Sequence, residues 1–182
     1  MSVRAKQWTR EEYDRLVAVG AFPPEARVQL IQGEIVEMTP QSAAHATAVR
    51  RLQKVLDSIF LGGYDVRAQL PLALSELSEP EPDIAVVAGS LDDYRDRHPT
   101  TAVLLIEVAD STLGFDRTRK LEMYADARIP EYWIVNLVDS VLEVYREPQG
   151  SAYRTEHRLG PDEAIALASA PTRRLMVGDI LP

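Results

Sequence analysis

The sequence predicts an α/β (α+β) fold built on a mixed sheet, with the core order helix, three strands, helix, strand. Three observations predict it. One long apolar stripe recurs at helical spacing, several short runs rich in Val, Ile and Leu are typical of strands covered on both faces, and a second helical pattern separates the last two of these runs. Such an alternation of helices and strands predicts helices packed on a central sheet.

A short helix and a hairpin are expected before this core. Thr9 and Glu12 have the capping-box spacing, and Gly20 ends the helical pattern that they begin. Residues 28–38 are expected to form a hairpin that turns at Gln32-Gly33, because glycine readily adopts the positive φ that a two-residue turn requires.

The core elements and the C-terminal extension follow in order. Ser42 is expected to cap the long helix and Gly62-Gly63 to stop it; Asp116 is expected to cap the second helix. The long helix is expected to run from residue 43 to the glycine stop at 62–63, and the second helix over residues 117–127. The strands are expected at residues 64–74, 83–88, 101–109, 131–137, 141–146, 153–158 and 164–167, before a polar tail.

Length and composition predict one domain over residues 1–182, with the core at about 28–147. The chain has 28 acidic and 20 basic side chains, a formal net charge of -8 and no cysteine, which excludes thiolate metal sites and cysteine nucleophiles. The acidic balance argues against coating nucleic acid by charge alone. The longest apolar runs have five residues, as in 84–88, and no apolar leader is visible, so we expect a soluble, cytoplasmic protein without membrane contact.

The motifs that bind nucleotides or build a serine hydrolase are missing from the sequence. It has neither a P-loop, nor a dinucleotide-binding glycine pattern, nor a nucleophile elbow, so no organic cofactor is expected. His45, His98 and His157 lack zinc-binding spacing. Oxygen ligands remain for any metal.

Two carboxylates stand out because they lie in apolar strand patterns. Asp83 opens one strand, and Glu107 interrupts the next. If the strands bring them within about 4 Å, they repel each other by roughly 4 kcal/mol at an effective dielectric near 20, so a cation must offset this repulsion. Mg²⁺ bound by both carboxylates would do so, and an Arg or Lys partner in a structural ion pair is the alternative.

Lys120 is the third candidate. On the expected helix it shares a face with Arg117 and Tyr124, and it follows the Glu107 strand closely enough to reach back over the strand end. An ammonium there could stabilise charge on a phosphate. The alternative is a solvated lysine on an amphipathic helix.

Four segments in order carry a family resemblance. They are Glu81-Pro82-Asp83, the stretch 106–112 around Glu107, the stretch 116–125 around Lys120 and Tyr124, and residues 129–135. Together they resemble the Uma-type family of the PD-(D/E)XK nuclease superfamily over about residues 28–147. The resemblance implies a restriction-endonuclease-like fold, a homodimer acting on DNA, Mg²⁺ or Mn²⁺ on Asp83 and Glu107, and Lys120 as the catalytic lysine.

The sequence departs from the parent motif at one position, since Ala109 stands where that motif has its lysine. The ammonium would then come from the following helix. The resemblance also implies site roles for Glu34 and His45, whose alternatives are a solvated hairpin acid and a helix-start residue bonded to backbone. Asp110 is interpreted as a turn residue, and a supporting acid of the site is the alternative.

Other functions stay open at the level of sequence. A catalytically silent nuclease fold that binds nucleic acid or protein is the main alternative, and RNA or a small phosphodiester could replace DNA. Arg50, Arg51 and Lys54 on the long helix are interpreted as a solvated face rather than a phosphate track.

Overall fold

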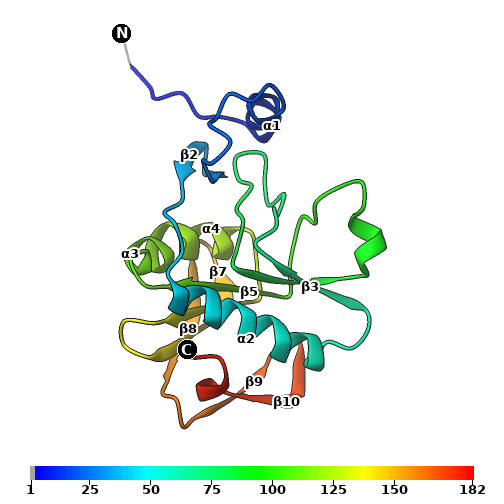
Figure 1. Cartoon of the computed structure of the whole chain (residues 1–182), viewed down its shortest axis with the longest axis vertical. Helices are drawn as coiled ribbons and strands as arrows, with labels where there is room; N and C mark the ends of the chain where they lie inside the picture. Colours follow the sequence, from blue (N-terminus) through cyan, green and yellow to red (C-terminus); the bar gives the residue numbers. More distant parts are fainter. Residues whose placement is uncertain (1–2) are drawn as a thin grey trace.

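The computed structural model describes residues 3–182 and is built around one six-stranded mixed sheet (Figure 1). The strand order is β3-β4-β5-β6-β7-β8, and every neighbouring pair is antiparallel except β5 and β6, which are parallel. The strands are β3 (Tyr64–Ala68), β4 (Ile84–Ala88), β5 (Leu104–Ala109), β6 (Glu131–Asn136), β7 (Val141–Gln149) and β8 (Ala152–Leu159). With helix α2 before β3 and a helical segment between β5 and β6, the predicted order of helix, three strands, helix, strand is confirmed.

Different elements cover the two faces of the sheet. Helix α2 (Ala43–Ile59) packs on one face together with the small sheet of β9 (Ala164–Leu167) and β10 (Ala170–Met176), which lies beside α2 in Figure 1. The helical segment from α3 (Leu113–Phe115) to α4 (Leu121–Asp126) packs on the other face. Because both faces are covered, β4, β5 and β6 are apolar and almost wholly buried, as their composition predicts.

The N-terminal elements form as their local signals predict. Helix α1 (Arg10–Ala18) starts with a capping box between Thr9 and Glu12. Strands β1 (Val28–Ile31) and β2 (Glu34–Glu37) form the hairpin, and Gln32 adopts a positive φ as well as Gly33, which is the geometry of a type I′ turn. No helix in residues 3–182 is both long and apolar enough to cross a membrane.

Two expectations about strands were wrong. The strand predicted for 64–74 ends at Ala68, because Gln69 has a φ of 53° and its N–H turns toward the carbonyl oxygens of Pro82 and Asp83. The alternating pattern continues past this point because Leu72 is buried without belonging to a strand. The polar tail expected after residue 167 instead forms β10, whose Leu175 enters the core beside α2.

The second helix begins earlier than predicted. It was expected to start at residue 117 with Asp116 as its cap, but the chain is already helical from Leu113, and Asp116 lies inside the helical segment. The five residues Asp116–Lys120 form a π-helical turn, which inserts an extra residue into the helical repeat. Asp116 is therefore a buried side chain of the helix interior, not a cap.

Candidate active site

Asp83 and Glu107 meet across neighbouring strands. The antiparallel register pairs Ile84 with Ile106, so the next pair in the same register is Asp83 and Glu107. Directly opposed residues of an antiparallel pair project from the same face of the sheet. Both side chains are buried, with 8% of Asp83 and 2% of Glu107 exposed. Two carboxylates thus share one nearly dry location, as the sequence predicts.

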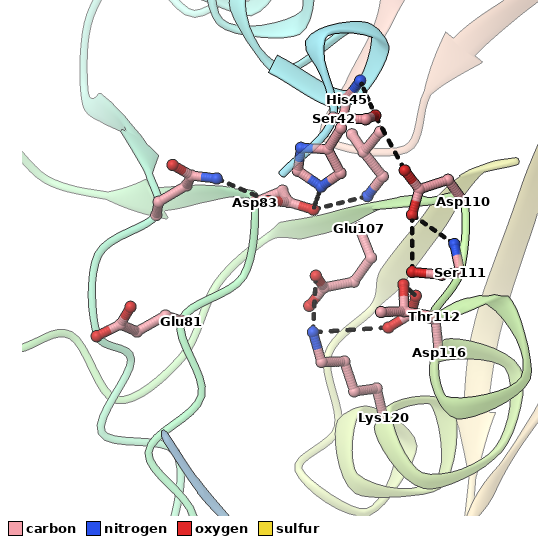
Figure 2. A network of polar contacts seen from close by, with 12 residues as sticks. Ser42, His45, Glu81, Asp83, Glu107, Asp110, Ser111, Thr112, Asp116 and Lys120 are labelled. Atoms are coloured by element: carbon pink, nitrogen blue, oxygen red, sulfur yellow. Dashed lines mark hydrogen bonds and ion pairs between the residues drawn. The ribbon is translucent and has the colours of Figure 1, made fainter. Parts of the chain in front are cut away.

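Asp83 is held by three donors, which come from α2, from β5 and from the bend after β3 (Figure 2). Its Oδ2 accepts hydrogen bonds from the Val108 backbone N–H at 2.9 Å and from His45 Nε2 at 3.0 Å, and its Oδ1 accepts one from Gln69 Nε2 at 3.0 Å. Burial alone would raise the pKa of Asp83, but the bonds from His45, Gln69 and Val108 outweigh it, so the pKa is lowered. Asp83 is fixed in place as an ionised carboxylate.

Glu107 has a different environment on the α4 side. Its Oε1 accepts a hydrogen bond from the Tyr124 hydroxyl at 2.6 Å, and its Oε2 lies 2.8 Å from Lys120 Nζ. Complete burial raises the pKa of Glu107 to about 7, and the charges of Asp83 and Asp116 add to this effect while Lys120 opposes it. The site therefore holds more negative charge than its single ammonium balances.

Lys120 is buried beside two carboxylates, with 1% of the residue exposed. Its Nζ lies 3.6 Å from Asp116 Oδ1, in addition to the contact with Glu107. Burial would lower the pKa of Lys120, but the charges of Glu107 and Asp116 more than compensate, so the net direction is upward and the amine stays protonated. The alternative of a solvated lysine is wrong.

The π-helical turn determines which side chains face the site. Asp116 and Lys120 project together toward Glu107, and Asp116 Oδ2 accepts a hydrogen bond from the Thr112 hydroxyl at 2.6 Å. Arg117, expected on the same face as Lys120, instead donates from Nε to Glu143 at 2.9 Å. Sequence reasoning missed Asp116 because it assigned that residue to a cap.

Helix α2 brings His45 to the site from the opposite side. Ser42 caps α2 by accepting from the His45 backbone N–H, and its hydroxyl donates to Asp110 Oδ2 at 3.0 Å. Burial would lower the pKa of His45, but the hydrogen bond and the charge of Asp83 raise it overall. Within residues 3–182 no partner reaches the buried Nδ1 of His45. Asp110 also accepts from the Ser111 backbone, so its turn role is combined with a place at the site.

A small polar cavity of about 40 Å³ lies against these side chains. That volume has room for a few water molecules, and the lining groups are mostly polar. Its lining includes Asp83, Glu107, Lys120 and His45 from the core of the site and Asp110 and Thr112 from the turn after β5. Arg27, Gln29 and residues 38–41, from the hairpin and the chain on either side of it, complete it with Glu81 and Val108. The cavity thus brings Asp83, Glu107, Lys120 and His45 together in one site.

Glu34 is not brought to this cavity. Its side chain is 63% exposed and lies 3.3 Å from Arg119 Nη1, at a separate hollow of about 670 Å³ between the hairpin and α4. Gln69, in contrast, lies at the site but was not predicted from the sequence, because nothing in an alternating strand pattern indicates a positive φ. Of the expected site residues, Asp83, Glu107, Lys120, His45 and Tyr124 converge.

Comparison with known proteins identifies the family of the chain. The Uma2 family model, described as "Putative restriction endonuclease", matches residues 10–177. The chain belongs to the Uma2 family. The restriction-endonuclease-like resemblance read from the sequence is thereby confirmed.

One solved structure shares the fold. A structure described as a putative nuclease belonging to DUF820, from Anabaena variabilis ATCC 29413, superposes with a TM-score of 0.73 and 17% identity, covering 94% of this Uma2 chain and 96% of its own. At that identity the likeness concerns the fold alone. The type IIG restriction endonuclease BpuSI matches at 16% identity over 57% of this chain and 11% of its own, with a TM-score of 0.32 that carries no argument. Comparison with curated proteins finds no match.

The donor set of this Uma2 chain fits a hard divalent cation. Within residues 3–182 no group of three or more His, Asp or Glu side chains is arranged to hold a metal ion. Mg²⁺, however, usually takes only one or two carboxylates and keeps several waters. Asp83 Oδ1 and both oxygens of Glu107 each have a single polar partner, which leaves acceptor capacity beside the cavity. Buried Asp116 Oδ1 has no hydrogen-bond partner among these residues, a further sign of excess negative charge.

Proposed function

We propose that this protein is a metal-dependent endonuclease that hydrolyses phosphodiester bonds in DNA. The observation that carries the proposal is the opposed pair Asp83 and Glu107, each fixed by its own donors, with the buried ammonium of Lys120 2.8 Å from Glu107. Asp83 and Glu107 would hold Mg²⁺ or Mn²⁺. A bound divalent cation supplies a more acidic water and polarises a phosphoryl oxygen.

The protein's own groups have distinct tasks in this proposal. His45, Gln69 and the Val108 N–H keep Asp83 oriented and ionised. Lys120 carries a fixed positive charge in a nearly dry location, where it stabilises negative charge that develops on a phosphate far better than it could in water. Asp116 and Tyr124 are positioning residues, since each acts on Lys120 or Glu107.

Plasmid cleavage tests the proposal directly. Purified protein is incubated with supercoiled plasmid in Mg²⁺ or Mn²⁺ over a range of salt concentrations, and nicked and linear products are quantified. We expect wild-type cleavage, and a rate at least about 100-fold lower for Asp83→Asn and for Glu107→Gln, because each removes one carboxylate of the pair. Glu122→Gln, an exposed carboxylate of α4, is the matched control and should cleave normally. No cleavage by wild type, or undiminished cleavage by Asp83→Asn, would contradict the proposal.

One observation favours a second candidate, a catalytically silent nuclease fold that binds nucleic acid or protein. Lys120 and Glu107 already pair at 2.8 Å, so part of the site charge is neutralised without a metal. Calorimetric titration with Mn²⁺ separates the two candidates. Binding to wild type that is lost in Asp83→Asn supports the nuclease, and the absence of metal binding supports the silent fold.

The proposal also includes a homodimer, because two sites can cut both strands of a duplex in one encounter. Multi-angle light scattering of the purified chain measures this. A mass near twice the 20.3 kDa of one chain is expected, and a monomer that still linearises plasmid would remove the homodimer from the proposal.

A further inference from the structure

The outer face of α2 carries a basic surface made by Arg50, Arg51 and Lys54, which we call the α2 basic face. All three residues are exposed, on the side of the helix away from the buried Ala48, Leu52 and Leu56. They border an open hollow of about 790 Å³ that runs along the helix. Arg50 and Lys54 are four residues apart, so their side chains are neighbours on the helix surface.

The cations of this face lack carboxylate partners. Twelve of the chain's 20 Lys and Arg side chains lie within 4 Å of a carboxylate oxygen. Within residues 3–182 none of those pairs includes Arg50, Arg51 or Lys54, and the one hydrogen bond among them runs from Arg51 to the Leu181 carbonyl. Two further unpaired cations, Arg173 and Arg174, lie on β10, which packs against α2.

The clustering sets these cations apart in a chain with net charge -8. Among residues 3–182, eight Lys and Arg side chains have no carboxylate partner within 4 Å, and five of these eight lie on α2 and β10. Cations left together without one produce a local positive potential, and a polyanion is attracted to it. The potential is complementary to a phosphodiester backbone, in which negative charges repeat regularly.

The α2 basic face lies on the helix that supplies His45 to the candidate active site, on the opposite side of that helix. The same helix contributes His45 to the cavity, and residues 38–41, which line the cavity, lead directly into it. Lys54 is nine residues beyond His45, about 13 Å along the helix axis. That length corresponds to about four phosphates of one strand of duplex DNA. A backbone that follows the outer face of α2 toward its N-terminus therefore reaches residues 38–41, which line the cavity of the Asp83–Glu107 pair.

We propose that the α2 basic face binds the phosphodiester backbone of DNA next to the bond that is cut. The inference rests on the proposed function and adds where the substrate lies. It reverses the sequence interpretation of Arg50, Arg51 and Lys54 as a merely solvated helix face. Arg51 is partly engaged by the C-terminal residues, so Arg50 and Lys54 are the principal contacts.

Fluorescence anisotropy in EDTA tests the surface without any cleavage. The probes are a fluorescein-labelled 30-base-pair DNA duplex and one of its single strands, titrated with the full chain between 50 and 200 mM salt. For Arg50→Gln/Lys54→Gln we expect a Kd raised at least about tenfold and a plot of log K against log salt that is less steep by about 1.8, since two phosphate contacts are lost. Circular dichroism verifies that the variant is folded.

Two matched variants complete the design. Arg95→Gln/Arg97→Gln changes the net charge equally on the exposed loop before β5 and should leave the Kd within about twofold. Arg50→Lys/Lys54→Arg keeps the charges and should bind like wild type. The proposal for the α2 basic face is overturned if Arg50→Gln/Lys54→Gln has the Kd of wild type, or if the Arg95→Gln/Arg97→Gln control loses as much affinity. It is overturned as well if wild type binds neither probe. It is also overturned if Arg50→Gln/Lys54→Gln alters only self-association, which would assign α2 to a second copy.

Failure of this inference and failure of the proposed function are distinguishable. If wild type binds DNA through Arg50 and Lys54 but cleaves no plasmid in Mg²⁺ or Mn²⁺, the DNA-binding role of the α2 basic face stands and the proposed nuclease activity is wrong. If wild type cleaves plasmid and Arg50→Gln/Lys54→Gln binds and cleaves as wild type does, the proposed nuclease activity stands and the DNA-binding role of the α2 basic face is wrong.

Discussion

At the scale of single residues, the buried charges around Glu107 depend on one another. Asp83, Glu107 and Asp116 are carboxylates with almost no exposure, and Lys120 is the one lysine or arginine side chain within 4 Å of Glu107 or Asp116 in residues 3–182. A buried ion pair contributes little net stability compared with a neutral replacement, but removing one partner leaves an uncompensated charge. The ammonium therefore has a structural task as well as the catalytic one proposed for it.

Lys120→Met is expected to lower the free energy of unfolding by about 3–5 kcal/mol at pH 7.5, because it leaves these carboxylates without their cation. Adding Glu107→Gln to it should recover at least about 1 kcal/mol, since one of the uncompensated charges disappears. Urea unfolding of wild type, both single variants and the double variant measures the coupling. Arg119→Met, the half-buried neighbour, should cost less than about 1 kcal/mol. A loss for Lys120→Met no larger than that of Arg119→Met would contradict this account of the site.

The sequence and the family resemblance identified Asp83, Glu107, Lys120, His45 and Tyr124 but not Asp116 or Gln69, for a physical reason. Asp83 and Glu107 are visible because an ionisable side chain in an apolar strand pattern needs an explanation. Asp116 and Gln69 occupy places that local patterns assign to a cap and to a strand, and their roles depend on a π-helical turn and a positive φ that no side-chain periodicity encodes. Glu34, in contrast, was expected at the site, but the structure places it at a different hollow.

At the scale of elements, the loop of residues 75–82, which leads into Asp83 and β4, packs against the N-terminal hairpin. Its Glu79 donates a backbone hydrogen bond to the Leu30 carbonyl of β1, and its side chain is mostly buried, 3.8 Å from Arg10. Burial raises the pKa of Glu79 to about 6, and the charges of Asp14 and Glu81 add to the effect while Arg10 opposes it. The loop thus carries a carboxyl group that is more easily accommodated when neutral.

The sign of the resulting pH dependence follows from that pKa. Since the folded-state pKa of Glu79 lies above its ordinary value, its contribution to stability is full below about pH 4.5 and is lost as the pH rises through about 6. Glu79→Gln should therefore stabilise the fold at pH 8, by about 1 kcal/mol, which is less than the full shift would give because the carboxyl keeps some contact with water. At pH 4.5 the difference should vanish.

Thermal and urea unfolding at pH 4.5, 6 and 8 measure this difference. Glu76→Gln, an exposed acid of the same loop, is the control and should leave the stability unchanged at each pH. A gain for Glu79→Gln that is equal at pH 4.5 and pH 8 would show that titration of Glu79 is not its cause.

At the scale of the whole molecule, the C-terminal extension shares the core of the main sheet. Ile165, Leu167, Leu175 and Ile180 pack in the same apolar cluster as α2 and the central strands. The sequence predicted β9 but indicated a polar tail after it. The strand β10 contains exposed Arg173 and Arg174 and few inward-facing apolar residues, so its pattern does not indicate a strand. Long-range burial, which a local pattern does not encode, makes these residues part of the fold.

One buried carboxylate ties the extension to the sheet. Glu131 at the start of β6 is fully buried and accepts hydrogen bonds from Trp133 Nε1 at 2.9 Å, from Arg146 Nε at 2.8 Å and from the backbone N–H of Ala168 at 2.8 Å. Arg146 also donates to the Ala166 carbonyl of β9. The main sheet and the β9–β10 sheet therefore meet at Glu131.

Glu131→Ala should destabilise the protein by about 3–5 kcal/mol, because it leaves the Arg146 guanidinium, the Trp133 indole and the Ala168 N–H without their acceptor in a dry interior. Amides of residues 164–176 should lose hydrogen-exchange protection before those of β4 and β5, since Glu131 is their tie to the sheet. Glu156→Ala, an exposed acid on β8, is the control and should change stability by less than about 0.5 kcal/mol. If Glu131→Ala instead lowers protection equally in β4, β5 and residues 164–176, the extension unfolds only together with the sheet, and the tie at Glu131 has no separate role.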